Sequence, residues 1–152
     1  MKQVKFISLL ALIIFVLSIS TAFAQRERGW QGSGGWGMGA PYQRIYNPAT
    51  VETVSGTVES ISKITPFKCM RYGIHISLKT EEESISVHLG PGWYIESLDI
   101  KIEKGDKLEV KGSRVKVADK EAIIAAEIKK GDDVLILRDG AGVPAWVGWR
   151  RR

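Results

Sequence analysis

Two stretches of this chain alternate strictly between apolar and polar residues, and a short polar segment joins them. A period of two residues is typical of a β-strand with one buried face. One face of residues 70–79 and 84–89 carries only apolar side chains: Met70, Tyr72, Ile74, Ile76, Leu78, Ile85, Val87 and Leu89. Residues 80–83, which read Thr-Glu-Glu-Glu, suit the turn between the two stretches. The pattern therefore predicts a β-hairpin, which needs further strands to cover its apolar face.

The rest of the chain supplies those strands as short segments between turn residues. Residues 51–64 are rich in Val, Thr, Ser and Ile, and Gly56 indicates a bend that lets one long strand serve two neighbours. Further strands are predicted at residues 108–117, 121–129 and 134–137, and only residues 93–98 suit a short helical turn. This order predicts an all-β fold, a five- to six-stranded OB-type barrel over residues 49–138. A β-sandwich of the same strands is the alternative.

The first 24 residues have the pattern of a secretory signal peptide. Lys2 and Lys5 precede an uncharged apolar run, and Ala22-Phe23-Ala24 is a small-x-small cleavage pattern. The run of about 14 residues is shorter than the ~20 that a spanning helix needs. We therefore expect cleavage before Gln25 and export to the periplasm, and no later segment is apolar enough to span a membrane.

The two ends of the expected mature chain differ in composition from the middle. Residues 25–48 are rich in glycine and carry Trp30 and Trp36, which predicts a flexible arm, either a docking arm or a linker. Residues 139–152 form a tail that could engage a polyanion or a partner, or pack its tryptophans on the barrel. Its candidate residues are Trp146, Trp149, Arg150, Arg151 and Arg152.

Four segments resemble one known family. They are residues 47–56, the run His88-Leu89-Gly90-Pro91-x-Trp93-Tyr94, residues 105–115 beginning Gly105-Asp106-Lys107, and residues 143–150. Together they resemble small exported bacterial OB-like proteins, a family that includes the domain shared by the magnetosome proteins MamS and MamX. The resemblance implies a fold and a compartment but no reaction. Relatives of the MamX type carry paired haem-attachment motifs, and with Cys69 as its single cysteine this chain departs from them, so we expect no haem.

The two histidines are the candidate site. If residues 80–83 form a four-residue turn, His75 falls directly opposite His88, with Cβ atoms roughly 4.5–5.5 Å apart. Both would then lie on the open face of the hairpin. There they could hold Zn²⁺ or Cu²⁺, form a pH-sensitive pair, or simply support the strands.

Three further residues extend the predicted ligand-binding face. Arg71 shares the face of His75, and Trp93 and Tyr94 are either a stacking platform beside it or a plug for the barrel. Cys69 lies ~20 Å from His75 along an extended strand, so we expect it outside the site. A lone exported thiol is buried, free or used between chains, and of these we expect it to be buried.

The functional prediction is a non-catalytic binding or adaptor module, because the chain contains none of the common catalytic motifs. The expected partner is an envelope protein, and no cofactor is expected apart from a metal at the histidines. The alternatives are a structural partner of an envelope, magnetosome-like or redox assembly, and a weak polyanion binder acting through the tail. Nucleic acid is disfavoured, because residues 45–138 carry almost equal numbers of basic and acidic side chains.

Overall fold

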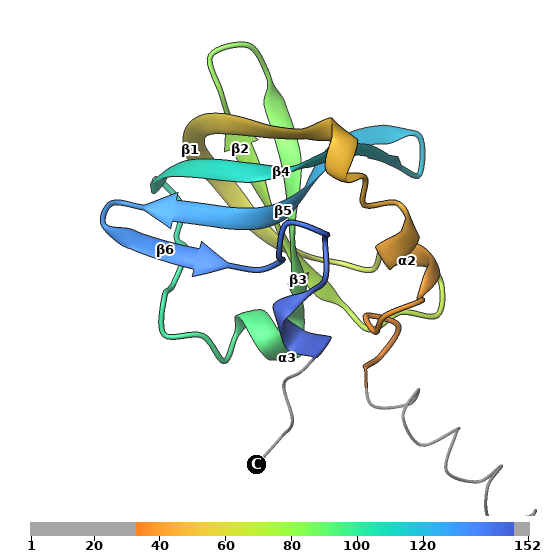
Figure 1. Cartoon of the computed structure of the whole chain (residues 1–152). Coiled ribbons are helices and arrows are strands. Elements are labelled where there is room, and N and C mark those ends of the chain that lie inside the picture. Colours follow the sequence, from red (N-terminus) through yellow and green to blue (C-terminus); the bar gives the residue numbers. More distant parts are fainter. Residues whose placement is uncertain (1–32, 148–152) are drawn as a thin grey trace, which may run out of the picture. The chain divides into compact units, whose positions relative to one another are not determined.

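The strands expected from the alternation are present, and they belong to one sheet (Figure 1). The computed structural model describes residues 33–147. Within this range the strands are β1 (Val51–Ile64), β2 (Gly73–Lys79), β3 (Ser84–Pro91), β4 (Lys107–Val117), β5 (Lys120–Lys130) and β6 (Asp133–Ile136). The short helices are α2 (Pro41–Arg44), η1 (Pro48–Thr50), α3 (Gly92–Ile95) and η2 (Ala145–Val147). No helix in residues 33–147 is long and apolar enough to cross a bilayer.

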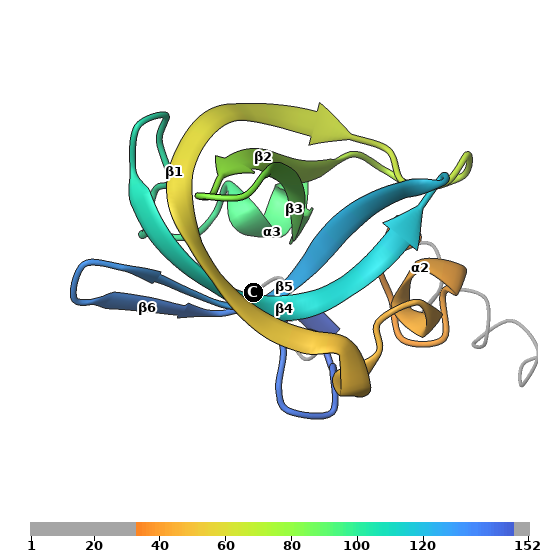
Figure 2. The ribbon, with the colours of Figure 1, turned by 90° about the horizontal axis from the view of Figure 1, so that it is seen from above.

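The sheet closes on itself. Its strands are ordered β3-β2-β1-β4-β5-β6, and β3 also pairs with β5 in parallel, residues 86–88 against 122–124. The ring therefore runs β1–β2–β3–β5–β4 and back to β1, with β6 extending from it to one side (Figure 2). Closure removes the exposed edges of these five strands. The fold is thus the small all-β barrel predicted from the sequence and not the alternative sandwich.

Strand β1 makes the closure possible because it serves two neighbours. Residues 51–57 pair with β4, residues 57–64 pair with β2, and Thr57 is paired on both sides. At Gly56 a side chain would collide with the Lys79 carbonyl at the end of β2, so only glycine allows this approach. The prediction that this long strand serves two neighbours is confirmed, while the register shift of β1 lies between Val58 and Ser60 and not at Gly56.

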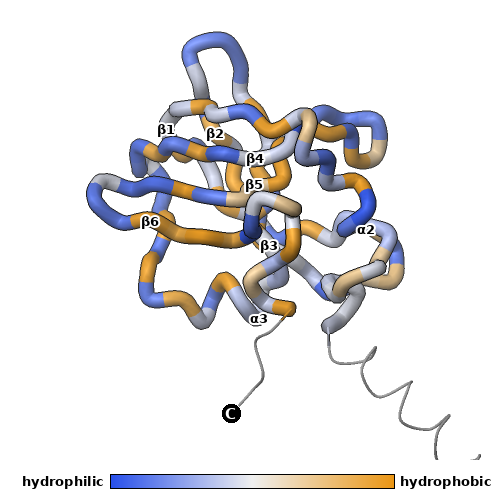
Figure 3. The backbone as a smooth tube through the Cα atoms, in the orientation of Figure 1, coloured by the Kyte–Doolittle hydropathy of each residue, from blue (hydrophilic) through white to orange (hydrophobic). Residues whose placement is uncertain are grey.

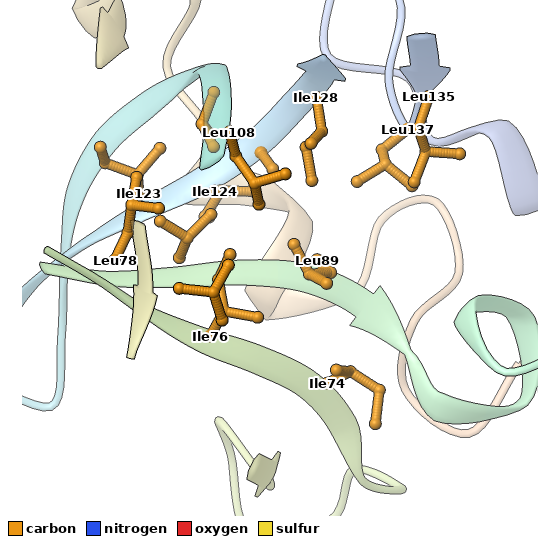
Figure 4. Close-up of a cluster of buried hydrophobic side chains, with 14 of the residues drawn as sticks. Ile74, Ile76, Leu78, Leu89, Leu108, Ile123, Ile124, Ile128, Leu135 and Leu137 are labelled. Atoms are coloured by element: carbon orange, nitrogen blue, oxygen red, sulfur yellow. The ribbon is translucent and has the colours of Figure 1, made fainter. Parts of the chain in front are cut away.

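The barrel interior is filled by aliphatic side chains from every strand. Figure 4 shows these side chains pointing toward one another from strands on opposite sides of the ring. Ile76, Leu78, Val110, Ile123 and Ile124 are all fully buried. In Figure 3 hydrophilic segments gather at the hairpin turns, and hydrophilic and hydrophobic residues alternate along the strands. Residues 121–129, which form the middle of β5, are a strand as predicted.

The segment before β1 differs from the predicted flexible arm in the part that the structure describes. Trp36 and Tyr42 are both buried and belong to the core cluster. The Trp36 ring lies against Gly73, where any side chain would collide with it. Pro41 opens α2 at a position where its fixed φ favours a helix. The glycine-rich composition misled the prediction, because burial of two large aromatic rings outweighs the entropy cost of ordering the glycines. Residues 1–32, with the predicted signal peptide, lie outside the described range.

Candidate functional site

The two histidines are paired as predicted. In the β2–β3 ladder His75 is the direct partner of His88, and their ring centroids are 6.0 Å apart. The ladder shifts register between Ile74 and His75, one step before the pair. The apolar residues that alternate with the histidines, Ile76 and Val87, are buried inside the barrel, so both histidines lie on its outer side.

This outer face is not open, contrary to the prediction. His88 is only 3% exposed. The Tyr42 hydroxyl lies 3.0 Å from His88 Nδ1, and the two rings stack nearly parallel, at 7°, with centroids 6.0 Å apart. The segment that contains α2 therefore covers the half of the face that carries His88. His75 is half-buried, and its Nδ1 lies 3.2 Å from the Ser86 hydroxyl.

Burial keeps both imidazoles neutral at neutral pH. It lowers the pKa of His88 to about 4, and the nearby His75 contributes to the same shift. Burial also lowers the pKa of His75. Both shifts follow from the cost of placing a cation where water is excluded.

A metal site at this pair would have few ligands. Across residues 33–147 no group of three or more His, Cys, Asp or Glu side chains is placed to hold an ion. The Nδ1 atoms of both histidines face hydroxyl groups, so an ion would have to bind the Nε2 atoms. Binding of Zn²⁺ or Cu²⁺ by the pair remains a prediction.

The other predicted ligand-binding residues do not form one surface with the histidines. Tyr94 is buried in the core cluster, with its ring 5.5 Å from Trp146 and 6.1 Å from Trp93, so it packs on the barrel and is not an open stacking platform. Arg71 has an exposed side chain, while its carbonyl oxygen accepts a hydrogen bond from Trp36 Nε1.

The C-terminal tail is anchored by Trp146. Its side chain is buried, and Nε1 donates a hydrogen bond of 2.9 Å to the Trp36 carbonyl, 110 residues away in the chain. Trp146 is therefore a packing residue, which was the alternative considered for it. Trp149 and Arg150 to Arg152 lie outside the described residues.

Arg138 is a buried residue that the sequence did not single out. It is 3% exposed, and its guanidinium lies 5.4 Å from the Tyr46 ring centroid and 5.0 Å from that of Trp146. Nη1 donates to the Gln43 side chain and to the Gly142 carbonyl. No carboxylate among residues 33–147 forms an ion pair with it, and burial lowers its pKa. Arg138 thus connects the α2 segment to the chain after β6. No local pattern marks this role, because its partner Gln43 lies 95 residues away in the chain.

The loop between β1 and β2, residues 65–72, is the exposed surface beside this assembly. Phe67, Lys68, Cys69, Arg71 and Tyr72 are all exposed. Cys69 is therefore not buried as expected, and Tyr72 precedes β2 and does not join its apolar face. Tyr72 was assigned to that face by extending the alternation too far toward the N-terminus of the strand, whereas burial of Cys69 was expected only because it is a lone thiol.

The backbone of this loop, in contrast, is held at its C-terminal end, and one of its side chains packs on Tyr42. The Arg71 carbonyl accepts from Trp36, the Tyr72 carbonyl accepts from the Gly92 amide at 3.0 Å, and the Phe67 ring packs edge-on to Tyr42 at 6.2 Å. A fixed backbone thus presents two aromatic and two basic side chains to solvent.

Comparison with known proteins identifies one family. The sequence profile described as the MamS/MamX magnetosome protein family matches residues 50–135, from the start of β1 into β6. No curated protein matches the chain significantly.

Proposed function

The chain belongs to the MamS/MamX magnetosome protein family, and from this we propose that it is an exported, non-catalytic binding module that holds a protein partner in the cell envelope. The order of the barrel strands, with α3 between β3 and β4, supports assignment of the barrel to the OB type. Export rests on the signal-peptide pattern of residues 1–24.

The observation that carries this proposal is the β1–β2 loop. Interfaces are enriched in aromatic and arginine side chains, and Phe67, Arg71 and Tyr72 are such residues held on a fixed backbone. Because the loop is already ordered, little conformational entropy is lost when a partner binds. Lys68 and Arg71 favour a partner whose surface combines an apolar patch with acidic groups.

The histidine face is the weaker candidate for binding. A ligand could reach His88 only if Tyr42 and the α2 segment moved away, which would expose the buried rings of Trp36 and Tyr42. The exposed loop needs no such movement. The histidine pair supports the strands in this proposal, and the partner binds beside it.

Affinity capture from the envelope fraction tests the proposal. The mature protein is compared with the double variant Phe67→Ala/Arg71→Ala and with the control Lys111→Ala/Lys116→Ala, which changes two exposed side chains on β4. We expect one protein to be retained by the wild type and the control and lost by the loop variant. Its retention by the loop variant would contradict the proposal. Matching circular dichroism spectra establish that all three chains are folded.

A further inference from the structure

The end of the barrel next to α3 contains a cavity of about 410 Å³. Its inner wall is formed by Ile74 of β2, Leu89 of β3 and Leu135 of β6, all labelled among the buried side chains in Figure 4. Its outer wall is formed by Ile95 of α3 and by Ile100 and Ile102 of the chain that leads to β4. In Figure 1 this chain passes below β6. The volume falls within the ~300–1,000 Å³ of small-molecule sites, and an apolar wall is typical of them.

The mouth of the cavity carries more positive than negative charge. Lys63, Lys101 and Glu96 are its charged lining residues. Glu96 accepts a hydrogen bond from the Tyr72 hydroxyl and lies 4.0 Å from Lys63 Nζ. Lys101 Nζ donates to the Glu96 carbonyl oxygen at 2.9 Å, and among residues 33–147 it forms no ion pair with a carboxylate. The Glu96 carboxylate thus lies near the ammonium group of Lys63 alone, and the ammonium group of Lys101 has a neutral carbonyl as its partner.

We propose that this cavity binds a single-chain amphiphile, a straight alkyl chain with a carboxylate head group. The alkyl chain lies against Ile74, Leu89 and Leu135, and the head group stays at the mouth beside Lys63 and Lys101. A linear chain suits a cavity that lies between the end of the barrel and the chain of residues 95–102, and an anionic head supplies the charge that the mouth lacks. This site goes beyond the proposed partner surface, and none of the loop residues Phe67, Lys68 and Arg71 lines it.

Calorimetric titration with hexanoate, octanoate and decanoate tests the apolar part. Each buried methylene should strengthen binding about fourfold, so each step of two methylenes should lower Kd about fifteenfold. The variant Ile100→Glu, which places a carboxylate at the cavity wall, should abolish binding. The control Ile136→Glu makes the same change on the exposed side of β6, and it should leave Kd unchanged. A Kd independent of chain length, or equal loss in both variants, would overturn the proposal.

The head group is tested by comparing octanoate with 1-octanol. Octanoate should bind more tightly than 1-octanol. Lys63→Gln and Lys101→Gln should each weaken the binding of octanoate about two- to fivefold, as expected for exposed ion pairs, and should leave the binding of 1-octanol unaffected. Equal binding of octanoate and 1-octanol would overturn the assignment of an anionic ligand. Because these measurements use the isolated protein, they fail or succeed independently of the partner capture described above.

Discussion

The Tyr42 hydroxyl lies 3.0 Å from Nδ1 of His88, and this contact joins the segment before the barrel to the outer side of β3. His88 is buried by the contact. Its neighbours are Tyr42 and the half-buried His75, and Arg138 lies near Tyr42 in turn. None of these groups provides a negative charge to a protonated His88, because burial holds the pKa of Tyr42 above its ordinary value. Protonation of His88 is therefore coupled to the stability of the fold.

Stability should fall with pH below about 6.5 because of His88. Its pKa is about 4 in the folded chain and ~6.5 in the unfolded chain, so between these values the unfolded state binds the proton first. The free energy of unfolding should drop by about 3 kcal/mol as pH falls through this window. Urea unfolding at several pH values measures the loss. In His88→Gln the free energy of unfolding should change much less between pH 6.5 and 4.5. An unchanged dependence on pH would show that His88 does not cause the loss of stability.

Trp36 should be essential to stability although it lies outside the strands. Its side chain is fully buried, and truncation of a buried tryptophan typically costs about 3–5 kcal/mol. Met38 is two residues away and 54% exposed, so Met38→Ala should change stability by less than about 0.5 kcal/mol. Thermal unfolding of Trp36→Ala and Met38→Ala gives the comparison. Equal losses of stability in the two variants would mean that the segment before β1 does not pack on the barrel.

The fold should be destabilised less when Arg138 loses its charge than when its side chain is shortened and keeps the charge. Arg138→Lys keeps a buried cation that no longer spans Gln43 and Gly142, and it should destabilise the fold by about 2–4 kcal/mol. Arg138→Met removes the charge and fills a similar apolar space between Tyr46 and Trp146, so it should cost less. Urea unfolding at neutral pH ranks the two variants. If Arg138→Met were the less stable, the hydrogen bonds of Arg138 would outweigh the cost of burying its charge.

Processing of the chain has its own test. Mass spectrometry of the protein recovered from the envelope should show Gln25 as the first residue, because the cleavage pattern ends at Ala24. An intact Met1 on membrane-bound material would contradict the export step.

The strands and the register of the histidines could be predicted because they depend on local patterns. The period of two residues identifies the buried face, and a four-residue turn then leaves one pairing in which His75 meets His88. The prediction that this face is open failed for His88, because the covering residues come from a glycine-rich segment with no periodicity. Trp36 and Trp146 meet across 110 residues of chain, and Arg138 contacts Gln43 across 95. No local rule predicts such contacts, and they decide which parts of the surface remain accessible.

A photo-crosslinker on the Cys69 thiol tests the partner surface most directly. Cys69 is the single cysteine of the chain and is exposed on the β1–β2 loop, so it can be labelled without substitution. The control is Cys69→Ser/Lys116→Cys, which moves the label to an exposed position on β4. In the envelope fraction, irradiation should join one protein to the label at Cys69 and none to the label at the control position. Crosslinking to the same protein from both positions, or from the control position alone, would contradict the assignment of the β1–β2 loop as the binding surface.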